Sequence, residues 1–146
     1  MAGTVAMEGS RTLLQCIYVS TAFHPMSDSE LVSLLETSRR TNVEAGISGV
    51  LIYCDGCFLQ VIEGPAEVVD SLFESISKDR RHHSVTQLVY EEVSKRAFSQ
   101  LDMGFVKATS DDLHVISGFD GMSSLADLDG GQAKILLDRF RTARVA

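Results

Sequence analysis

The chain has 146 residues, of which 45% are hydrophobic and 23% charged, and its formal net charge is −7. This length allows one core with a short appendage, and the composition is that of a globular protein and not of a disordered one. The negative charge, without a stripe of basic and aromatic residues, argues against nucleic-acid binding. The longest apolar runs are strand-length and residues 1–11 lack the pattern of an export signal, so we expect a cytoplasmic protein without a membrane span.

The N-terminal part predicts a strand followed by a helix. Residues 13–20 are apolar and rich in strand formers. Ser27 and Glu30 have the spacing of a capping box, so a helix should begin there and end at Gly46. The stripe of this helix that should face the core runs through Leu31, Leu34, Leu35 and Ser38. One further step along the stripe falls on Asn42, so a polar amide should point toward the core.

A hairpin that contains two cysteines follows. Residues 47–53 and 58–62 should form antiparallel strands about Asp55-Gly56, because Asp-Gly between apolar runs is a strong turn signal. Cys54 and Cys57 flank this turn and spell C-x-x-C. The third cysteine of the chain does not complete a zinc site, and an odd number without an export signal argues against a disulfide framework. We therefore interpret the two thiols as facing each other across the turn, without a metal.

A second helix and two more strands complete the predicted core. Pro65 suits the first turn of a helix whose apolar stripe should lie on the sheet. Residues 80–83 are basic and should close this helix, where positive charge suits the exposed carbonyl groups. Strands are expected at residues 85–93 and 101–106. The resulting order, β-α-β-β-α-β-β, favours an α+β ferredoxin-like sandwich, with two helices on one face of a mixed five-stranded sheet.

The remaining residues should form a C-terminal appendage. Thr109 to Asp112 could cap a short helix, and a final helix with one apolar face should follow Gly130-Gly131. We expect residues 11–107 to form the domain and residues 108–146 its helical extension. The final helix could cover the open face of the sheet or join subunits, and covering is favoured because that face would otherwise expose apolar surface.

Three polar residues are expected on surfaces that should otherwise be apolar. Strand alternation places Gln60 on one face with the apolar residues Phe58 and Ile62. Tyr18 is a further polar side chain among apolar neighbours, on the first strand. A buried amide without partners costs about 1 to 3 kcal/mol, so Gln60 either pairs internally or meets a ligand. A structural Tyr18–Gln60 bond between neighbouring strands would by itself be a sufficient explanation. Asn42, directed at the same space, favours a ligand pocket that suits a flat heterocycle with alternating carbonyl and N–H groups.

Seven blocks of sequence resemble the BLUF family and occur in that family's order, from about residue 13 to residue 105. The blocks are Leu14–Ser20, Ser38–Asn42, Gly46–Leu51, Asp55-Gly56, Phe58–Pro65, Asp79–His82 and Arg96–Phe98. Each block is weak evidence by itself, whereas the ordered set is highly specific. The resemblance implies a blue-light receptor that holds FAD between two helices, with FMN or riboflavin as alternatives.

The resemblance also implies the residues that carry the photochemistry. Tyr18 matches the tyrosine that donates an electron to the excited flavin, and Gln60 matches the glutamine between that tyrosine and the ring. Met103 matches the methionine of the last strand, near Gln60. Light should leave the Gln60 side chain in a new orientation or tautomer, which strengthens a hydrogen bond to the flavin carbonyl and shifts the spectrum to the red.

Four further residues match positions that bind the cofactor. Asn42 matches the asparagine that pairs with the polar edge of the ring, and Ser38 matches a serine that helps to orient this asparagine. Arg81 and His82 match a basic pair that flanks the flavin on the second helix. The resemblance therefore implies a site built from the first strand, the second strand of the hairpin and both helices.

The chain departs from the family pattern at two positions. Leu101 stands where the family often has Trp, and the chain contains no Trp at all, so Tyr18 has no competing aromatic donor there. Thr41 stands where some relatives have His or Asn, so one face of the ring should be contacted differently. Neither departure removes the residues expected to bind the flavin.

The resemblance implies a receptor and not an enzyme, because no substrate is turned over. Its output should be a separate signalling protein, with homo-oligomers as a further option.

Two alternatives stay open. An acylphosphatase-like enzyme could use Arg81 and Asn42 to hold a phosphoryl group, although the chain lacks an anion-cradling loop before its first helix. An interaction module without flavin would have to explain why Tyr18, Asn42 and Gln60 lie in its core.

Overall fold

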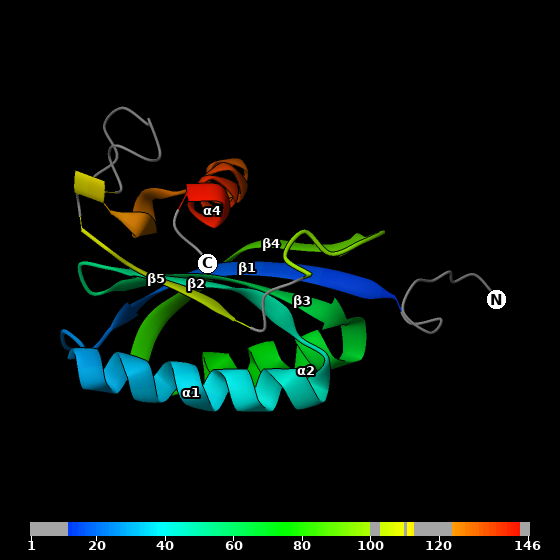
Figure 1. Ribbon diagram of the computed structural model, residues 1–146, viewed down its shortest axis with the longest axis horizontal. Coiled ribbons are helices and arrows are strands. Elements are labelled where there is room, and N and C mark those ends of the chain that lie inside the picture. The colour runs from blue at the N-terminus through cyan, green and yellow to red at the C-terminus, as the bar shows by residue number, and fades with distance from the viewer. Residues whose placement is uncertain (1–11, 100–102, 110, 113–123, 144–146) are drawn as a thin grey trace.

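The computed structural model describes residues 12–99, 103–109, 111–112 and 124–143, with side chains up to residue 140. A mixed five-stranded sheet of order β4-β1-β3-β2-β5 forms its centre. Helices α1 and α2 cover one face of the sheet, and α4 lies across the other (Figure 1). The elements are β1 (Leu13–Ala22), α1 (Asp28–Ala45), β2 (Ser48–Cys54), β3 (Cys57–Pro65), α2 (Ala66–Ser77), β4 (His82–Val93), β5 (Gly104–Ala108), the short 3-10 helix η1 (Leu125–Asp127) and α4 (Gly130–Ala143). The predicted α+β ferredoxin-like architecture is confirmed.

Local signals set the start and the end of α1. Ser27 Oγ accepts from the backbone N–H of Glu30 at 3.2 Å, and Glu30 Oε1 accepts from the backbone N–H of Ser27 at 2.9 Å, which is the predicted capping box. Gly46 ends the helix with φ +75°, a left-handed conformation that glycine adopts at little cost. Helix α1 therefore presents Leu31, Leu35 and Asn42 to the sheet as buried residues, as expected.

The central hairpin sets which residues share a face. Asp55 and Gly56 have φ values of +49° and +80°, the positive values that a two-residue hairpin turn requires. Cys54 and Cys57 pair across this turn as buried free thiols, so their expected placement opposite each other is confirmed. Because β1 also pairs antiparallel with β3, Tyr18 lies directly opposite Gln60.

Helix α4 covers the sheet face that α1 and α2 leave open. Four of its side chains are fully buried and belong to one cluster with residues of β1, β2, β3 and β5: Ala133, Leu136, Leu137 and Phe140. Gly130 allows this close approach, since a Cβ there would lie 2.8 Å from the backbone oxygen of Leu88 on β4. Covering of the sheet, the favoured alternative, is therefore what the structure shows for the last helix, although Gly130 and Gly131 belong to its first turn and do not precede it.

The end of α2 differs from the prediction. Pro65 is the last residue of β3, and α2 ends at Ser77, before the basic residues 80–83. The carboxylate of Asp79 accepts from the backbone N–H of Arg81 at 2.9 Å, so a turn replaces the expected last helical turn. Arg81 lies in this turn and His82 begins β4, so neither residue is on the second helix.

The C-terminal strands also differ in their bounds. Strand β4 begins at His82 and not at residue 85, and β5 begins at Gly104. Residues 100–102 are not described, so Leu101 and its departure from the family pattern lie outside the described residues. Thr109 and Asp112 exchange the hydrogen bonds of a helix cap, each with a side-chain oxygen 3.1 Å from the other's backbone nitrogen. Residues 111 and 112 are helical, and residues 113–123 are not described.

Candidate functional site

A cavity of about 220 Å³ lies between the sheet and the helices α1 and α2. Its walls are both apolar and polar, and β1, β3, α1, α2 and the turn before β4 all contribute to them. The six residues expected to contact a cofactor all line this cavity, although they come from positions up to 64 residues apart: Tyr18, Ser38, Asn42, Gln60, Arg81 and His82. Met103, the seventh predicted residue, lies behind Gln60 and contacts it directly.

Tyr18 and Gln60 form a hydrogen-bonded pair across two neighbouring strands. The Tyr18 hydroxyl donates to Gln60 Oε1, and both side chains are buried. Burial raises the pKa of the Tyr18 hydroxyl well above its ordinary value, and the nearby Cys16 and Asp79 act in the same direction. The hydroxyl therefore stays protonated at any physiological pH, and its proton already points at the Gln60 carboxamide.

The other end of the Gln60 carboxamide contacts Met103. Gln60 Nε2 donates to Met103 Sδ at 3.3 Å, and the Met103 side chain is 1% exposed. A thioether is a weak acceptor, so this contact contributes less than the bond to Tyr18. The two bonds give the carboxamide one orientation, with its oxygen toward Tyr18 and its nitrogen toward Met103.

Asn42 is a buried polar residue of the site that lacks an internal partner among the described residues. Its side chain is 3% exposed and lines the cavity from the last turns of α1. Within the described part of the chain, no group forms a hydrogen bond with its carboxamide. An unmet buried amide costs about 1 to 3 kcal/mol. The donor and the acceptor of Asn42 therefore fit a ligand edge that offers both, such as the carbonyl and N–H edge of a flavin ring.

His82 closes the cavity from the start of β4. One ring nitrogen lies 2.7 Å from the Ile76 carbonyl oxygen at the end of α2, and the other lies 2.7 Å from Ser20 Oγ on β1. Because the carbonyl can only accept, Nε2 carries the proton and Nδ1 accepts from the Ser20 hydroxyl when the ring is neutral. The ring also meets Tyr18 edge-on, with centroids 6.4 Å apart. His82 thus ties β1, β4 and α2 together beside Tyr18.

Arg81 and Asp79 form an ion pair at the exposed edge of the cavity. Arg81 Nη2 lies 2.5 Å from Asp79 Oδ2, and the Arg81 side chain is 60% exposed. Hydrogen bonds from Arg81 lower the pKa of Asp79 to about 2. The edge of the cavity is therefore charged and open to solvent, whereas the end at Tyr18 and Gln60 is buried.

Several lining residues were not identified from the sequence. Leu72 and Ile76 on α2 have the helical spacing of core residues, and no sequence signal separates a core position from a cavity wall. Asp79 also lines the cavity, and it stands within the block Asp79–His82 that carried the family resemblance. That block could therefore have identified Asp79 as a residue of the site. Thr41, the second departure from the family pattern, also lines the cavity.

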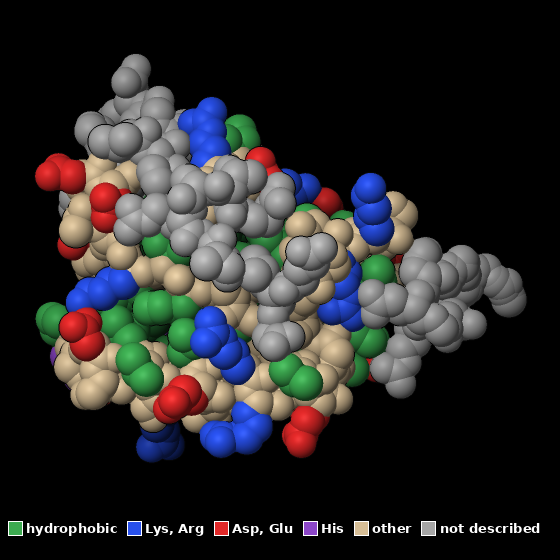
Figure 2. Space-filling view, in the orientation of Figure 1, with side chains coloured by type: hydrophobic (Ala, Val, Ile, Leu, Met, Phe, Trp, Pro, Cys, Tyr) green, Lys and Arg blue, Asp and Glu red, His purple; other side chains and the backbone are tan. Residues whose placement is uncertain are grey.

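Three features of the described residues concern partners and metals: the surface charge, the helices and the metal-ligating side chains. On the face shown in Figure 2, acidic and basic side chains are interspersed over the described residues. Among the helices of the described residues, none is long and apolar enough to cross a membrane. Within the same residues, no group of three or more His, Cys, Asp or Glu side chains is placed to hold a metal ion.

A comparison with protein-family models finds a match over most of the chain. The family model described as BLUF, sensors of blue-light using FAD, matches residues 13–104. A photoactivated adenylate cyclase subunit beta from Euglena longa is 33% identical over 95 residues, which are 65% of this chain and 11% of the relative. The chain thus spans about a tenth of the length of the curated relatives it matches.

Two solved structures are similar over nearly the whole chain. BlsA in its photo-activated state has a TM-score of 0.81 at 28% identity, and the match covers 92% of this chain and 98% of that one. The BLUF protein BlrB in its dark state has a TM-score of 0.76 at 28% identity, with coverage of 91% and 97%. These are matches to light sensors, which decides against the acylphosphatase-like alternative and supports the expectation that this domain is not an enzyme.

Proposed function

The chain belongs to the BLUF family of blue-light sensors that use FAD, and from that premise we propose how its own residues bind the flavin and convert light into a signal. The cavity between α1 and α2 holds the ring, and FAD is the form bound. FMN or riboflavin could occupy the same cavity, because the residues proposed as contacts surround the ring. When bound, the flavin supplies the absorption of blue light and the capacity to accept an electron and a proton.

Asn42 is the main residue that orients the ring. Its carboxamide is buried without an internal partner in the described residues, so it is free to pair with the polar edge of the ring. Ser38, one turn earlier on α1, lines the same wall; it forms no hydrogen bond with Asn42 in this structure, and its role in orienting Asn42 belongs to the flavin-bound protein. Arg81 and His82 flank the ring from the opposite side, with Arg81 at the exposed edge and His82 fixed between Ser20 and Ile76.

The Tyr18–Gln60 pair is the photochemical switch, and this pair is the single observation that carries the proposal. With flavin bound, Tyr18 would supply the electron that the excited ring accepts, and its hydroxyl proton would move toward Gln60 Oε1 along the hydrogen bond that already joins the two side chains. Both return to Tyr18, so nothing is consumed. The Gln60 carboxamide would be left in a new orientation or tautomer, from which it would offer a stronger hydrogen bond to the ring carbonyl. Burial makes the change consequential, since hydrogen bonds strengthen at low dielectric and an unmet buried partner is costly.

The signal leaves the site through Met103 and reaches another protein. Met103 is bonded to Gln60 and directly precedes β5, an edge strand of the sheet. The curated relatives are photoactivated adenylate cyclases, in which the matched part is about a tenth of the chain. For this chain we propose a separate signalling protein in the cytoplasm as the output, with homo-oligomers as a further level of assembly. Residues 11–107 would form the flavin-binding domain and residues 108–146 its helical extension.

Light-minus-dark absorption spectra of the purified protein test this proposal. The wild-type protein should carry FAD, identified by chromatography after denaturation, and should show a reversible red shift after blue light. Tyr18→Phe keeps the ring but removes the donor, and Gln60→Leu keeps the volume but removes the amide, so both variants should bind flavin and show no red shift. A normal red shift in either variant would contradict the switch, and a wild-type protein that does not bind added FAD would contradict the cofactor.

A further inference from the structure

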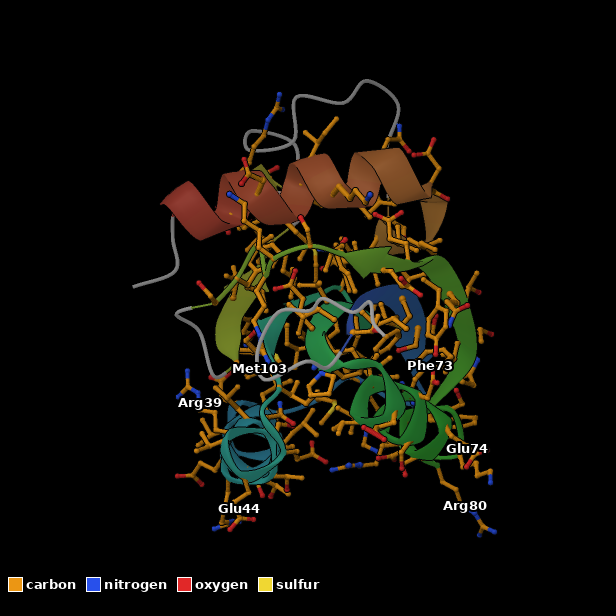
Figure 3. The ribbon with its side chains drawn as sticks, turned by 90° about the vertical axis from the view of Figure 1, so that its right-hand side faces the viewer. Arg39, Glu44, Phe73, Glu74, Arg80 and Met103 are labelled. Atoms are coloured by element: carbon orange, nitrogen blue, oxygen red, sulfur yellow. The ribbon has the colours of Figure 1, made fainter. Side chains whose placement is uncertain are left out.

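The backbone next to the switch is held by a residue on the outer side of α1. Arg39 Nε donates to the backbone oxygen of Met103 at 3.1 Å, across 64 residues of sequence. Figure 3 shows the two residues beside each other at the α1 side of the sheet. Arg39 does not line the cavity, and its side chain reaches Met103 from an exposed position. The contact therefore belongs to the surroundings of the flavin site and not to its wall.

This bond acts on the residue that accepts the hydrogen bond of Gln60. Met103 carries both contacts: its Sδ accepts from Gln60 Nε2 at 3.3 Å, and its backbone oxygen accepts from Arg39. A methionine side chain is flexible and a thioether is a weak acceptor. The contact with Gln60 therefore depends on how firmly the Met103 backbone is held.

The chain segment that ends at Met103 has a second anchor at its other end. The fully buried carboxylate of Glu63 accepts from the backbone N–H groups of Ala97 and Phe98 at 3.0 and 2.9 Å. The segment is thus attached to β3 at residues 97–98 and to α1 at Met103. Loss of the Arg39 bond would remove the attachment of Met103 to α1 and leave intact the bonds to Glu63 and the pairing of Gly104 with Val50 on β2.

We propose that Arg39 is a positioning residue that keeps the Met103 thioether within reach of Gln60 and thereby shortens the lifetime of the lit state. The inference rests on the proposed function, specifically on a rotation of the Gln60 carboxamide. In the dark orientation Nε2 donates to Met103 Sδ. After rotation Oε1 would face the same sulfur, so that two acceptors oppose each other. Holding Met103 in place favours the dark orientation and disfavours the rotated one.

Removal of the Arg39 donor should therefore slow the thermal return from the lit to the dark state. Arg39→Met keeps the length and helix propensity of the side chain but cannot donate. We expect its dark recovery to be about fivefold slower, the effect of one hydrogen bond of ordinary strength. Arg40→Met, the matched control, removes the same charge from the neighbouring exposed position and should recover at the wild-type rate. Arg39→Lys keeps a donor and should lie closer to wild type than Arg39→Met.

A double variant separates positioning from a general effect of charge. Met103→Leu removes the sulfur acceptor, so adding Arg39→Met to it should change the recovery rate no further. The infrared band of the flavin carbonyl in the lit state should be the same in Arg39→Met and wild type, because the rotated amide is unchanged.

The outcomes distinguish this inference from the function on which it rests. A wild-type protein without a red shift would overturn the proposed function itself. A normal wild-type red shift with unchanged recovery in Arg39→Met, or with equal slowing by Arg39→Met in the presence and absence of the Met103 sulfur, would overturn only the role of Arg39. Loss of flavin from Arg39→Met would place Arg39 in cofactor binding and would also overturn it.

Discussion

The two faces of the sheet are built from neighbouring residues of the same strands, yet they are filled in different ways. Val19 and Leu59 face α4, in a cluster of buried apolar side chains. Their neighbours Tyr18 and Gln60 face α1 and α2, where a cavity of about 220 Å³ lies among polar groups. One face is packed by the protein itself, and the other leaves room for a ligand.

The difference shows how a strand can serve two purposes at once. Because side chains alternate, one polar substitution in an apolar strand changes one face and leaves the other unaffected. The α4 face supplies stability through complete burial, for example of Leu136, Leu137 and Phe140. The α1/α2 face can then contain Asn42, a buried amide that costs stability until a ligand is bound. A substitution on the α4 face should therefore lower stability and spare the flavin site, whereas a substitution of Asn42 should lower flavin affinity and spare stability.

The largest effect is expected on the packed face. Phe140→Ala removes a fully buried ring from α4 and should lower the free energy of unfolding by about 3 to 5 kcal/mol. Phe140 does not line the cavity, so the folded fraction should keep a normal flavin spectrum and red shift. Chemical denaturation measured on flavin-saturated protein tests both expectations. Phe23→Ala is the control, since Phe23 is 63% exposed and its loss should cost less than about 1 kcal/mol.

A loss of the red shift in folded Phe140→Ala protein would contradict the division of labour between the faces. The α4 face would then take part in the photochemical response, and not only in stability.

Much of the architecture could be predicted because the deciding signals are local. The capping box at Ser27 and Glu30, the Asp55-Gly56 turn and strand alternation each depend on a few neighbouring residues. The same alternation placed Gln60 and Tyr18 on one face, and helical spacing placed Asn42 toward it. All three polar residues line one cavity, so their grouping was correct before any distance was known.

Other features depend on competing interactions or on contacts between residues far apart in the sequence, and these could not be predicted. The basic residues after α2 suit a helix end, but the side chain of Asp79 takes the backbone N–H of Arg81 and forms a turn instead. The bond between Arg39 and Met103 joins residues 64 positions apart, and an exposed arginine on a helix carries no signal of its partner. Leu72 and Ile76 follow a core pattern although they line the cavity.

The second prediction concerns the cavity face and should give the opposite pattern to Phe140→Ala. Asn42→Ala removes the proposed polar partner of the ring, and flavin affinity should fall about tenfold, as for the loss of one hydrogen bond of a desolvated group. The flavin-free protein should be as stable as wild type or more stable, because an unmet buried amide is replaced by a good helix former. Titration with FAD and denaturation of the flavin-free protein measure the two quantities.

Ser33→Ala is the matched control for this variant. Ser33 lies on the exposed side of α1, so its replacement also raises helix propensity but does not touch the cavity. It should leave FAD affinity unchanged. If Asn42→Ala binds FAD as tightly as Ser33→Ala does, Asn42 has only a structural role.

The smallest effect is expected at the exposed edge of the cavity, where Asp79 pairs with Arg81. Arg81 lowers the pKa of Asp79 to about 2, so the folded state binds a proton on this group less readily than the unfolded state, whose ordinary value is 3.8. The pair therefore stabilises the protein above about pH 4, and this contribution is lost as the pH falls from about 4 to 2. Because Arg81 is 60% exposed and solvent screens the pair, the contribution should be below about 1 kcal/mol.

Asp79→Asn should accordingly lower the free energy of unfolding slightly at pH 6, and the difference from wild type should shrink toward pH 2. Denaturant titrations at a series of pH values, with the exposed α2 variant Asp70→Asn as the control, measure this difference. A difference that stays constant down to pH 2 would mean that the Asp79 carboxylate does not stabilise the cavity edge by its charge.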